Sequence, residues 1–174
     1  MHNQKSKVRI KIREAVARDI PALIELNKAA YPVLATENIV WGESHLRSHQ
    51  RIFPQGQLVA EVEGRILGAS ASLIVDLGRD PLRHHTWSGI TDSGYFTNHD
   101  THGDTLYGAD VYVHPESRGL GVGAALYSAR RKLCRKLNKR RILAGGRLWN
   151  YDEQGTSMSP AEYAYKVAKG EMKW

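Results

Sequence analysis

The sequence predicts an α/β (α+β) domain in which a mixed central β-sheet is flanked by helices. Three observations support this class. Apolar and basic residues alternate over Val8–Arg13, the pattern of a half-buried strand. Apolar residues recur at helical spacing over Ile20–Ala30. A largely apolar strand, Thr105–Val113, leads through a proline-containing turn into a glycine-rich helix start.

The size and composition fit one soluble domain covering residues 1–174. The chain has 174 residues, of which 41% are hydrophobic, which is enough for a real core. It has one cysteine, Cys134, so no internal disulfide forms and a reducing, cytoplasmic setting is expected. Met1–Lys7 is polar and basic with no apolar segment behind it, which argues against a secretory signal.

The first helices are delimited by polar caps and prolines. We expect Asp19 to cap a helix over Ile20–Ala30, which Pro32 ends. A weaker pattern predicts a second helix over Glu43–Ile52, stopped by Pro54.

The middle of the chain predicts three strands. Gln57–Glu63 and Arg65–Val75 flank a tight turn at Glu63–Gly64. A long loop, Asp76–Gly103, precedes the strand Thr105–Val113, and long loops in compact domains are often functional.

The last third predicts helix, strand and helix. A helix is expected over Gly119–Leu137 and a short strand over Arg141–Ala144. Ser159, Pro160 and Glu162 form a capping-box start for a final helix.

The glycine-rich turn Arg118–Ala124 carries the clearest chemical signal. The first amides of a helix lack intrahelical partners and lie at the positive end of its dipole, so they bind anions such as phosphate. Glycines at 119, 121 and 123 would let the backbone approach a pyrophosphate, and Arg118 adds positive charge. Because each glycine inside a helix costs about 1 kcal/mol relative to alanine, a bound anion is a natural compensation.

Other anion-binding motifs fit less well. The spacing of the glycines and the absence of an acidic residue in Arg141–Ala144 argue against a dinucleotide fingerprint, and no Gly-Lys-Ser/Thr loop is present. Glycines packed closely against a strand remain an alternative. The net charge of +7 leaves nucleic acid open, but aromatic residues do not interleave with the basic residues from Arg130 to Arg141, so a solvated helix face is the simpler interpretation.

The segment Arg118-Gly-Leu-Gly-Val-Gly123 resembles the Arg/Gln-x-x-Gly-x-Gly/Ala signature of the GNAT N-acyltransferase superfamily. The resemblance covers most of the chain. It implies that acetyl-CoA is the cofactor and that the backbone of Val111 and Val113 pairs with its pantetheine arm, the Val113 N–H facing the thioester oxygen. It also implies that Arg130 or its neighbours meet the adenosine phosphate, and that the pyrophosphate lies on the amides of Arg118, Gly119, Leu120, Gly121, Val122, Gly123 and Ala124.

A narrower likeness concerns Trp87, Asp104–Pro115 and Ala144–Arg147. These segments are similar to the GNAT domain that is fused ahead of a carbon–nitrogen hydrolase (nitrilase-like) domain in some bacterial proteins. Two functions follow from the resemblance. One is an acetyl-CoA-dependent N-acetyltransferase acting on a small or peptide amine; the other is a non-catalytic acyl-CoA-binding module that regulates a hydrolase.

Catalytic residues are harder to assign. The family often uses a tyrosine of the last helix as the acid, which makes Tyr163 the first choice over Tyr151 and Tyr165. Asp110 is the candidate base, although a structural role is open for both residues. Cys134 lies within a helix pattern beside Leu133 and is expected in the core, not as a nucleophile.

The histidine-rich loop from His84 to Asp104 admits two interpretations. Its spacing matches no standard metal-ligand pattern, so no metal is expected. A loop that shapes the acceptor pocket is the preferred interpretation.

The end of the sequence raises a question about the sheet edge. The family normally continues with two more strands, whereas the sequence stops at Trp174. We therefore expect a second copy of the chain or a hydrolase domain to cover the edge of Arg141–Ala144, because Gly145–Ser157 has little β-propensity.

Overall fold

The structure is a computed structural model that describes residues 9–37, 39–82, 84–146, 148, 151 and 157–172. It divides into two compact units, Met1–Ala144 and Gly145–Trp174, and each is described by itself. Among the described helices, none is both long and apolar enough to cross a membrane.

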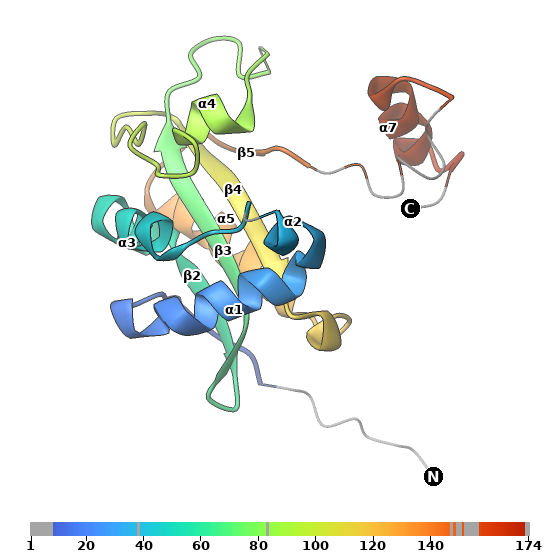
Figure 1. The fold of residues 1–174 in the computed structure, drawn as a ribbon. Helices are drawn as coiled ribbons and strands as arrows, with labels where there is room; N and C mark the ends of the chain where they lie inside the picture. The colour runs from blue at the N-terminus through green and yellow to red at the C-terminus, as the bar shows by residue number, and fades with distance from the viewer. Residues whose placement is uncertain are drawn as a thin grey trace. The chain divides into compact units, whose positions relative to one another are not determined.

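The first unit is built on a five-stranded mixed sheet, which confirms the predicted fold class (Figure 1). Its strands are β1 (Lys11–Glu14), β2 (Leu58–Val62), β3 (Arg65–Val75), β4 (Thr105–Val113) and β5 (Arg141–Ala144), in the spatial order β1-β2-β3-β4-β5. Neighbours are antiparallel from β1 to β4, and β5 is parallel to β4. The parallel pair requires a crossover, and the helix after β4 supplies it.

Helices cover both faces of this sheet (Figure 1). On one face lie α1 (Ile20–Ala30), α2 (Pro32–Thr36) and α3 (Glu43–Ile52), and on the other lies α5 (Val122–Lys136). A short helix, α4 (Trp87–Thr91), forms within the long loop before β4. The predicted bounds of α1 and α3 are confirmed, since prolines limit where each helix can start or continue.

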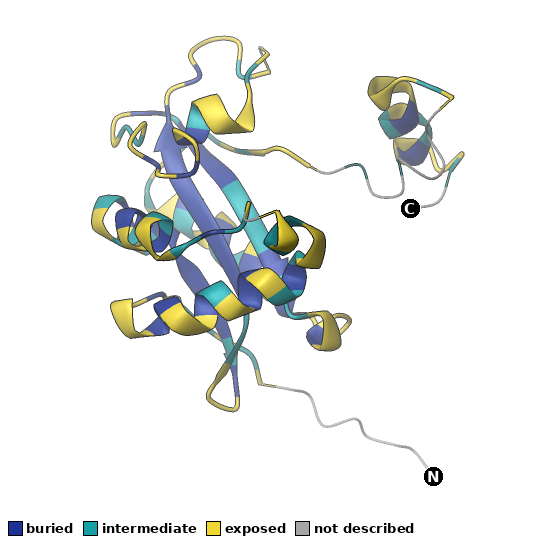
Figure 2. Ribbon diagram, in the orientation of Figure 1, coloured by how far each residue is buried: buried dark blue, intermediate teal, exposed yellow. Residues whose placement is uncertain are grey.

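The strands form the buried centre between exposed helix faces (Figure 2). One cluster packs α1 and α3 on the sheet around Leu23, Leu46, Leu73 and Tyr112. A second cluster packs α5 on the opposite face, with Val122 and Leu126 against Leu58 and Ala60 and the half-buried Val111 and Val113 beside them. The side chains of β4 therefore alternate between two separate cores.

The β2–β3 turn agrees with the sequence. Glu63 and Gly64 both have left-handed backbone, with φ of 50° and 79°. Two strands are shorter than predicted: β1 covers Lys11–Glu14 instead of Val8–Arg13, and β2 covers Leu58–Val62 instead of Gln57–Glu63. Val8 lies outside the described residues.

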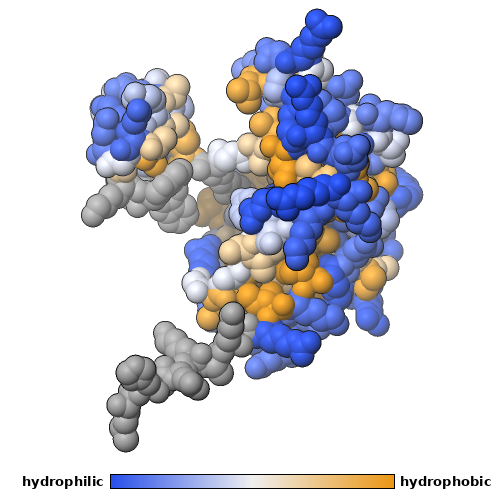
Figure 3. Space-filling view, turned by 180° about the vertical axis from the view of Figure 1, so that it is seen from behind, coloured by the Kyte–Doolittle hydropathy of each residue, from blue (hydrophilic) through white to orange (hydrophobic). Residues whose placement is uncertain are grey.

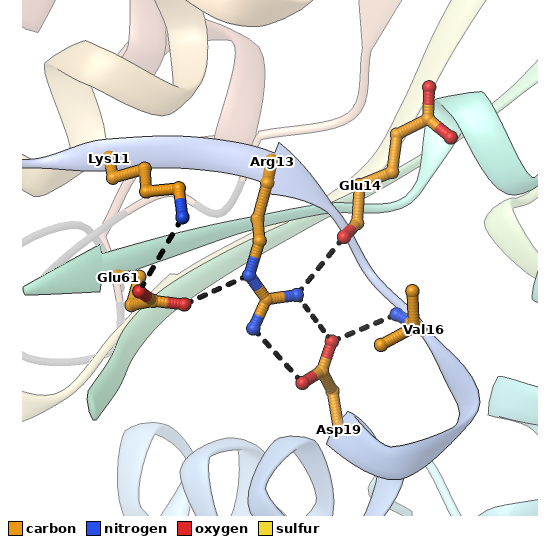
Figure 4. A network of polar contacts seen from close by, with 6 residues as sticks. All are labelled: Lys11, Arg13, Glu14, Val16, Asp19 and Glu61. Atoms are coloured by element: carbon orange, nitrogen blue, oxygen red, sulfur yellow. Dashed lines mark hydrogen bonds and ion pairs between the residues drawn. The ribbon is translucent and has the colours of Figure 1, made fainter. Parts of the chain in front are cut away.

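Arg13 ties β1 to β2 and to the turn that enters α1 (Figure 4). Its guanidinium donates two hydrogen bonds to Asp19, at 2.6 and 3.0 Å, and one to Glu61 at 2.9 Å. Asp19 also accepts the Val16 N–H at 2.8 Å, so its carboxylate closes the turn η1 (Ala17–Asp19). Asp19 is the N-cap residue of α1, as predicted, but its side chain makes no capping hydrogen bond, because its carboxylate is bonded to Arg13 and to the Val16 N–H.

The same network sets the charge state of Asp19. Burial raises the pKa of its carboxyl, but the hydrogen bonds from Arg13 and from the Val16 N–H outweigh burial, and the net pKa lies below its ordinary value. The Arg13 hydrogen bond likewise lowers the pKa of Glu61. Asp19 and Glu61 are therefore ionised near neutral pH, as Arg13 is.

The second unit contains α7 (Pro160–Ala168), the final helix that the sequence predicts. The Ser159 hydroxyl caps it by accepting the Glu162 N–H at 3.2 Å. Tyr163 is fully buried and its ring lies 5.3 Å from that of Tyr151. Most of Gly145–Ser157 lies outside the described residues.

Candidate functional site

The glycine-rich turn has a different backbone from the one predicted. Gly119 and Gly121 both have positive φ, of 80° and 86°. A left-handed residue cannot lie inside a right-handed helix, so α5 begins at Val122 with Gly121 as its N-cap, not at Gly119. The two glycines therefore shape a turn that leads from η3 (Pro115–Ser117) into the helix.

Close packing does not explain these glycines. A Cβ at Gly119 would meet no atom within 4 Å, and one at Gly121 would only touch Ile10 at 3.9 Å. Gly123 has helical backbone, and a Cβ there would make only an ordinary 3.9 Å contact with Val113. Positive φ accounts for Gly119 and Gly121, whereas neither conformation nor packing requires glycine at 123. A Cβ could therefore be added at each of the three positions without a close contact.

The first backbone amides of α5 lack intrahelical partners. Within α5 the Ala125 N–H donates to Gly121 O at 3.0 Å, so the amides of Val122, Gly123 and Ala124 precede the helical hydrogen-bond ladder. Arg118 is exposed on the approach to the same turn. This is the arrangement that a helix start offers to an anion.

Strand β4 carries a bulge near its middle. Asp110 lies opposite Ala71 of β3 while Gly108 lies opposite Ser72, so Ala109 is an extra residue. The parallel pairing with β5 ends at the same place, at Gly108 and Ala144. Beyond this point no strand pairs with the outer edge of β4 among the residues that the structure describes.

The direction of the edge amides follows from one hydrogen bond. The His114 N–H donates to Leu67 O of β3 at 2.9 Å. Because successive residues of a strand alternate in direction, Tyr112 faces β3 as His114 does, and the N–H groups of Val111 and Val113 face away from it. Two donors are therefore presented on the outer edge of β4, next to the start of α5.

Three side chains from distant elements hold the bulged segment by its carbonyl groups. The Trp87 indole, from α4, donates to Ala109 O at 3.0 Å. Arg130, from α5, donates to Asp110 O at 2.6 Å. The Tyr31 hydroxyl, from the α1–α2 junction, lies 2.7 Å from Asp110 Oδ1 and 3.3 Å from Val111 O. The irregular backbone is thus fixed from both faces of the sheet.

Arg130 does not lie where the resemblance places it. Its side chain is 2% exposed and donates inward to Ser72 Oγ and Ala71 O, both at 3.1 Å, so it cannot meet a phosphate in solvent. Burial lowers the pKa of its guanidinium. Its neighbours Arg131, Lys132 and Arg135 are exposed, and the view from behind, where α5 lies, shows strongly hydrophilic residues on that face (Figure 3).

The two candidate catalytic residues belong to different units. Asp110 is half-buried on β4, with its carboxylate at the Tyr31 hydroxyl. Tyr163 is buried within the second unit. The sequence analysis did not identify Tyr31 as a site residue. Its only local signal is its position directly before Pro32, the first residue of α2.

The long loop folds onto the α3 side of the sheet. The Trp41 ring lies 6.0 Å from that of Trp87, and His49 stacks on Phe96 at 3.8 Å. His49 Nε2 donates to Gly94 O at 2.6 Å, and burial lowers the pKa of its imidazole to about 3. Within the described part of the chain, no three His, Cys, Asp or Glu side chains gather in a metal-binding arrangement.

Cys134 is part of the core, as expected. It is 7% exposed and packs with Phe53, Ile74 and Leu106. Burial raises the pKa of its thiol, which disfavours the nucleophilic thiolate.

Comparison with known families and proteins places the chain among its relatives. Residues 20–155 match the model of the acetyltransferase (GNAT) family. The chain is 35% identical over 170 residues to an uncharacterized N-acetyltransferase, YkwB, of Bacillus subtilis, covering 98% of this chain and 75% of that protein. It is 40% identical over 158 residues to YhcX, a probable hydrolase of the same organism; the match covers 91% of this chain but only 30% of that longer protein.

Solved structures share the fold at low sequence identity. The loading GNATL domain of CurA from Lyngbya majuscula has a TM-score of 0.70 at 21% identity, covering 85% of this chain and 70% of that one. The GNAT-like decarboxylase GphF, solved with isobutyryl-CoA, has a TM-score of 0.71 at 21% identity, covering 92% and 77%. A GNAT family acetyltransferase from Brucella melitensis, solved with acetyl-CoA, has a TM-score of 0.53 at 19% identity, covering 84% and 82%.

Proposed function

Because this chain belongs to the acetyltransferase (GNAT) family, we propose that it is an acetyl-CoA-dependent N-acetyltransferase that acts on a small amine or an amino-terminal group. The observation that carries the proposal is the juxtaposition of two donor sets. The outward amides of Val111 and Val113 lie on the edge of β4, and the helix-start amides of Val122–Ala124 follow after η3 and the turn at Gly119 and Gly121.

Coenzyme A has the chemistry that such a surface would bind. Its pyrophosphate would lie on the turn Arg118–Ala124, where helix-start amides and the Arg118 charge favour an anion. Its pantetheine amides would pair with β4 as an added strand at Val111 and Val113. One of these two amides would face the thioester oxygen and stabilise the negative charge that develops there as the amine attacks.

The reaction also needs proton transfer. The attacking amine must lose a proton and the departing thiolate must gain one. Asp110 is the proposed base, because its carboxylate lies beside the free edge of β4. Tyr163 is proposed as an acid on the family pattern alone.

A second function is favoured by one comparison. The longer relative YhcX, of which this chain matches 30%, is named a probable hydrolase. A GNAT-like module that binds acyl-CoA without turnover and acts on an associated carbon–nitrogen hydrolase, or on a second copy of the chain, fits that observation.

Free thiol release distinguishes the two functions. Purified chain is mixed with acetyl-CoA and a panel of primary amines and free amino-terminal peptides, and coenzyme A is trapped with a thiol reagent. Transferase activity predicts amine-dependent release and an acetylated product by mass spectrometry. Binding of acetyl-CoA with no release above the enzyme-free rate for every amine favours the module instead.

The proposed catalytic residues are tested in the same assay. Asp110→Asn should lower kcat by about 100-fold or more, since positioned acid–base groups contribute that much. If Tyr163 is the acid, Tyr163→Phe slows thiol release more than it weakens acetyl-CoA binding. Unchanged turnover in either variant removes that residue from the mechanism.

A further inference from the structure

Tyr31 and Asp110 lie 79 residues apart in sequence and meet at the edge of β4. Tyr31 is the junction residue between α1 and α2, with φ of −131° and ψ of 63°, and Pro32 starts the next helix immediately behind it. The Tyr31 phenol extends from this junction to β4. Its hydroxyl lies 2.7 Å from Asp110 Oδ1, a short contact of the kind made to an ionised carboxylate.

The same hydroxyl lies at the unpaired edge of the strand. It is 3.3 Å from Val111 O, and the N–H and C=O of Val111 face away from β3. The phenol therefore lies beside Val111, one of the two residues whose outward amides are proposed to pair with the pantetheine arm.

Both partners are held by further contacts. The main-chain carbonyl of Asp110 accepts from buried Arg130 at 2.6 Å, so the backbone that carries the carboxylate is held by α5. The Tyr31 ring packs 6.2 Å from the ring of buried Tyr112. Groups held in this way keep their geometry without the cost of ordering them during a reaction.

We propose that Tyr31 and Asp110 form the proton-transfer pair of the acyltransfer, an inference that rests on the proposed function. The amine nitrogen attacks the thioester carbon, and the C–N bond forms as its proton passes to the Asp110 carboxylate. The C–S bond then breaks, and the departing thiolate takes the Tyr31 proton. The Tyr31 phenolate recovers a proton from the Asp110 carboxylic acid, so one proton has moved from nitrogen to sulfur and both residues are restored.

This assignment places the acid in the unit that holds the proposed cofactor site. Tyr163 lies in the second unit, buried against Tyr151. A phenol already at hydrogen-bond distance from the base needs no further rearrangement to exchange a proton with it.

The test compares Tyr31→Phe, Asp110→Asn and the double variant with the wild-type chain, and uses Tyr127→Phe as the matched control. Tyr127 is an exposed tyrosine of α5 in the same unit, and its ring contact with Arg130 is one that phenylalanine keeps. Acetyl-CoA-dependent thermal shifts first establish that each variant folds and binds.

We expect Tyr31→Phe and Asp110→Asn each to lower kcat by about 100-fold or more, with the KM for acetyl-CoA within about threefold of wild type. The kcat of the double variant should be little lower than that of the slower single variant, because loss of either residue already breaks the proton relay. Asp110→Asn should also remove the acidic limb of the pH profile of kcat/KM, which loss of a structural contact would leave in place.

Two results overturn the pair in distinguishable ways. If wild type transfers acetyl groups and Tyr31→Phe keeps its kcat, the pair is wrong and the transferase stands; loss of turnover in Tyr163→Phe would then assign the acid to Tyr163. If wild type binds acetyl-CoA and transfers to no amine in the panel, the proposed function falls together with the pair.

Discussion

The guanidinium of Arg130 donates to the main-chain carbonyl of Asp110 at 2.6 Å, across the bulge that interrupts β4. The same Arg130 nitrogen donates to Ala71 O on the neighbouring strand at 3.1 Å. Arg130 thus donates to the main-chain carbonyls of both Asp110 and Ala71, the pair at which the register between β3 and β4 shifts. Gly108 makes room for it, since a Cβ there would lie 2.6 Å from the guanidinium. The buried Arg130 guanidinium therefore supplies hydrogen bonds to the two strands at the bulge.

Loss of this guanidinium should be costly. Arg130→Met leaves two carbonyl oxygens without this donor in a buried place, and we expect the free energy of unfolding to fall by about 2–4 kcal/mol. Urea denaturation measures the change. Arg131→Met, an exposed neighbour on α5, is the control and should stay within about 0.5 kcal/mol of wild type. Equal stability of the two variants would show that Arg130 does not hold the bulge.

A substitution of Gly123 should affect coenzyme A binding without affecting folding. Gly123 has helical backbone, and a Cβ there would make only an ordinary contact, so Gly123→Leu should keep the melting temperature of the free chain. The added side chain would cover the first-turn amides, and the thermal shift produced by coenzyme A should be lost. Lys132→Leu, farther along the same helix, should respond like wild type. If Gly123→Leu shows the wild-type thermal shift with coenzyme A, the phosphate does not bind at this turn.

Gly121→Leu is expected to lose the same thermal shift for two reasons. It blocks the amides, and it forces a leucine into left-handed backbone at φ of 86°. Its melting temperature should therefore fall even without ligand, in contrast to Gly123→Leu. The comparison of both variants in one thermal-shift series checks the geometry of the turn.

His49 should make the fold sensitive to acid. Burial lowers its folded-state pKa to about 3, while the unfolded chain titrates near 6.5, so the unfolded state binds more protons between these values. The stability that neutral His49 contributes is complete above about pH 6.5 and is lost as the pH falls toward 3. Between pH 8 and pH 5 this amounts to about 2 kcal/mol.

Stability curves against pH measure this effect. The loss between pH 8 and pH 5 should be smaller by that amount in His49→Gln than in wild type, whatever the absolute stability of the variant. His102→Gln, at an exposed position, should follow the wild-type curve. Parallel curves for wild type and His49→Gln would place the acid sensitivity elsewhere.

Cys134 should take no part in turnover. Its thiol donates to Lys139 O at 3.5 Å and to Arg141 O at 3.6 Å inside the core, and burial disfavours the thiolate. Cys134→Ser should therefore keep the wild-type rate of any acyl transfer. Mass spectrometry of the chain during turnover checks this directly, and an acyl group on Cys134 would contradict it.

Local patterns predicted most of the secondary structure. The bounds of α1, α3 and the strands Arg65–Val75, Thr105–Val113 and Arg141–Ala144 are confirmed, because periodicity and proline or glycine punctuation act over a few residues. The glycine-rich turn was found, but its two left-handed residues were not, so the helix start was placed too early. A glycine permits positive φ without requiring it.

The details of the site depended on contacts that no local pattern carries. Arg130 lies in a run of basic residues, and only the three-dimensional packing shows that this one turns inward. The bulge at Ala109 is set by the register with β3. Tyr31 reaches Asp110 across 79 residues of chain, and sequence spacing gives no measure of that distance in space.

The central claim is that the outer edge of β4 binds acyl-CoA as an added strand, and amide hydrogen exchange at three adjacent residues tests it most directly. In the free chain Tyr112 faces β3, and Val111 and Val113 face outward, so the Tyr112 amide should exchange slowly and the other two faster. Saturating acetyl-CoA should slow exchange at Val111 and Val113 by about tenfold or more and leave Tyr112 slow, because the cofactor would pair with the outward amides only. Unchanged exchange at Val111 and Val113 with acetyl-CoA demonstrably bound would contradict the account.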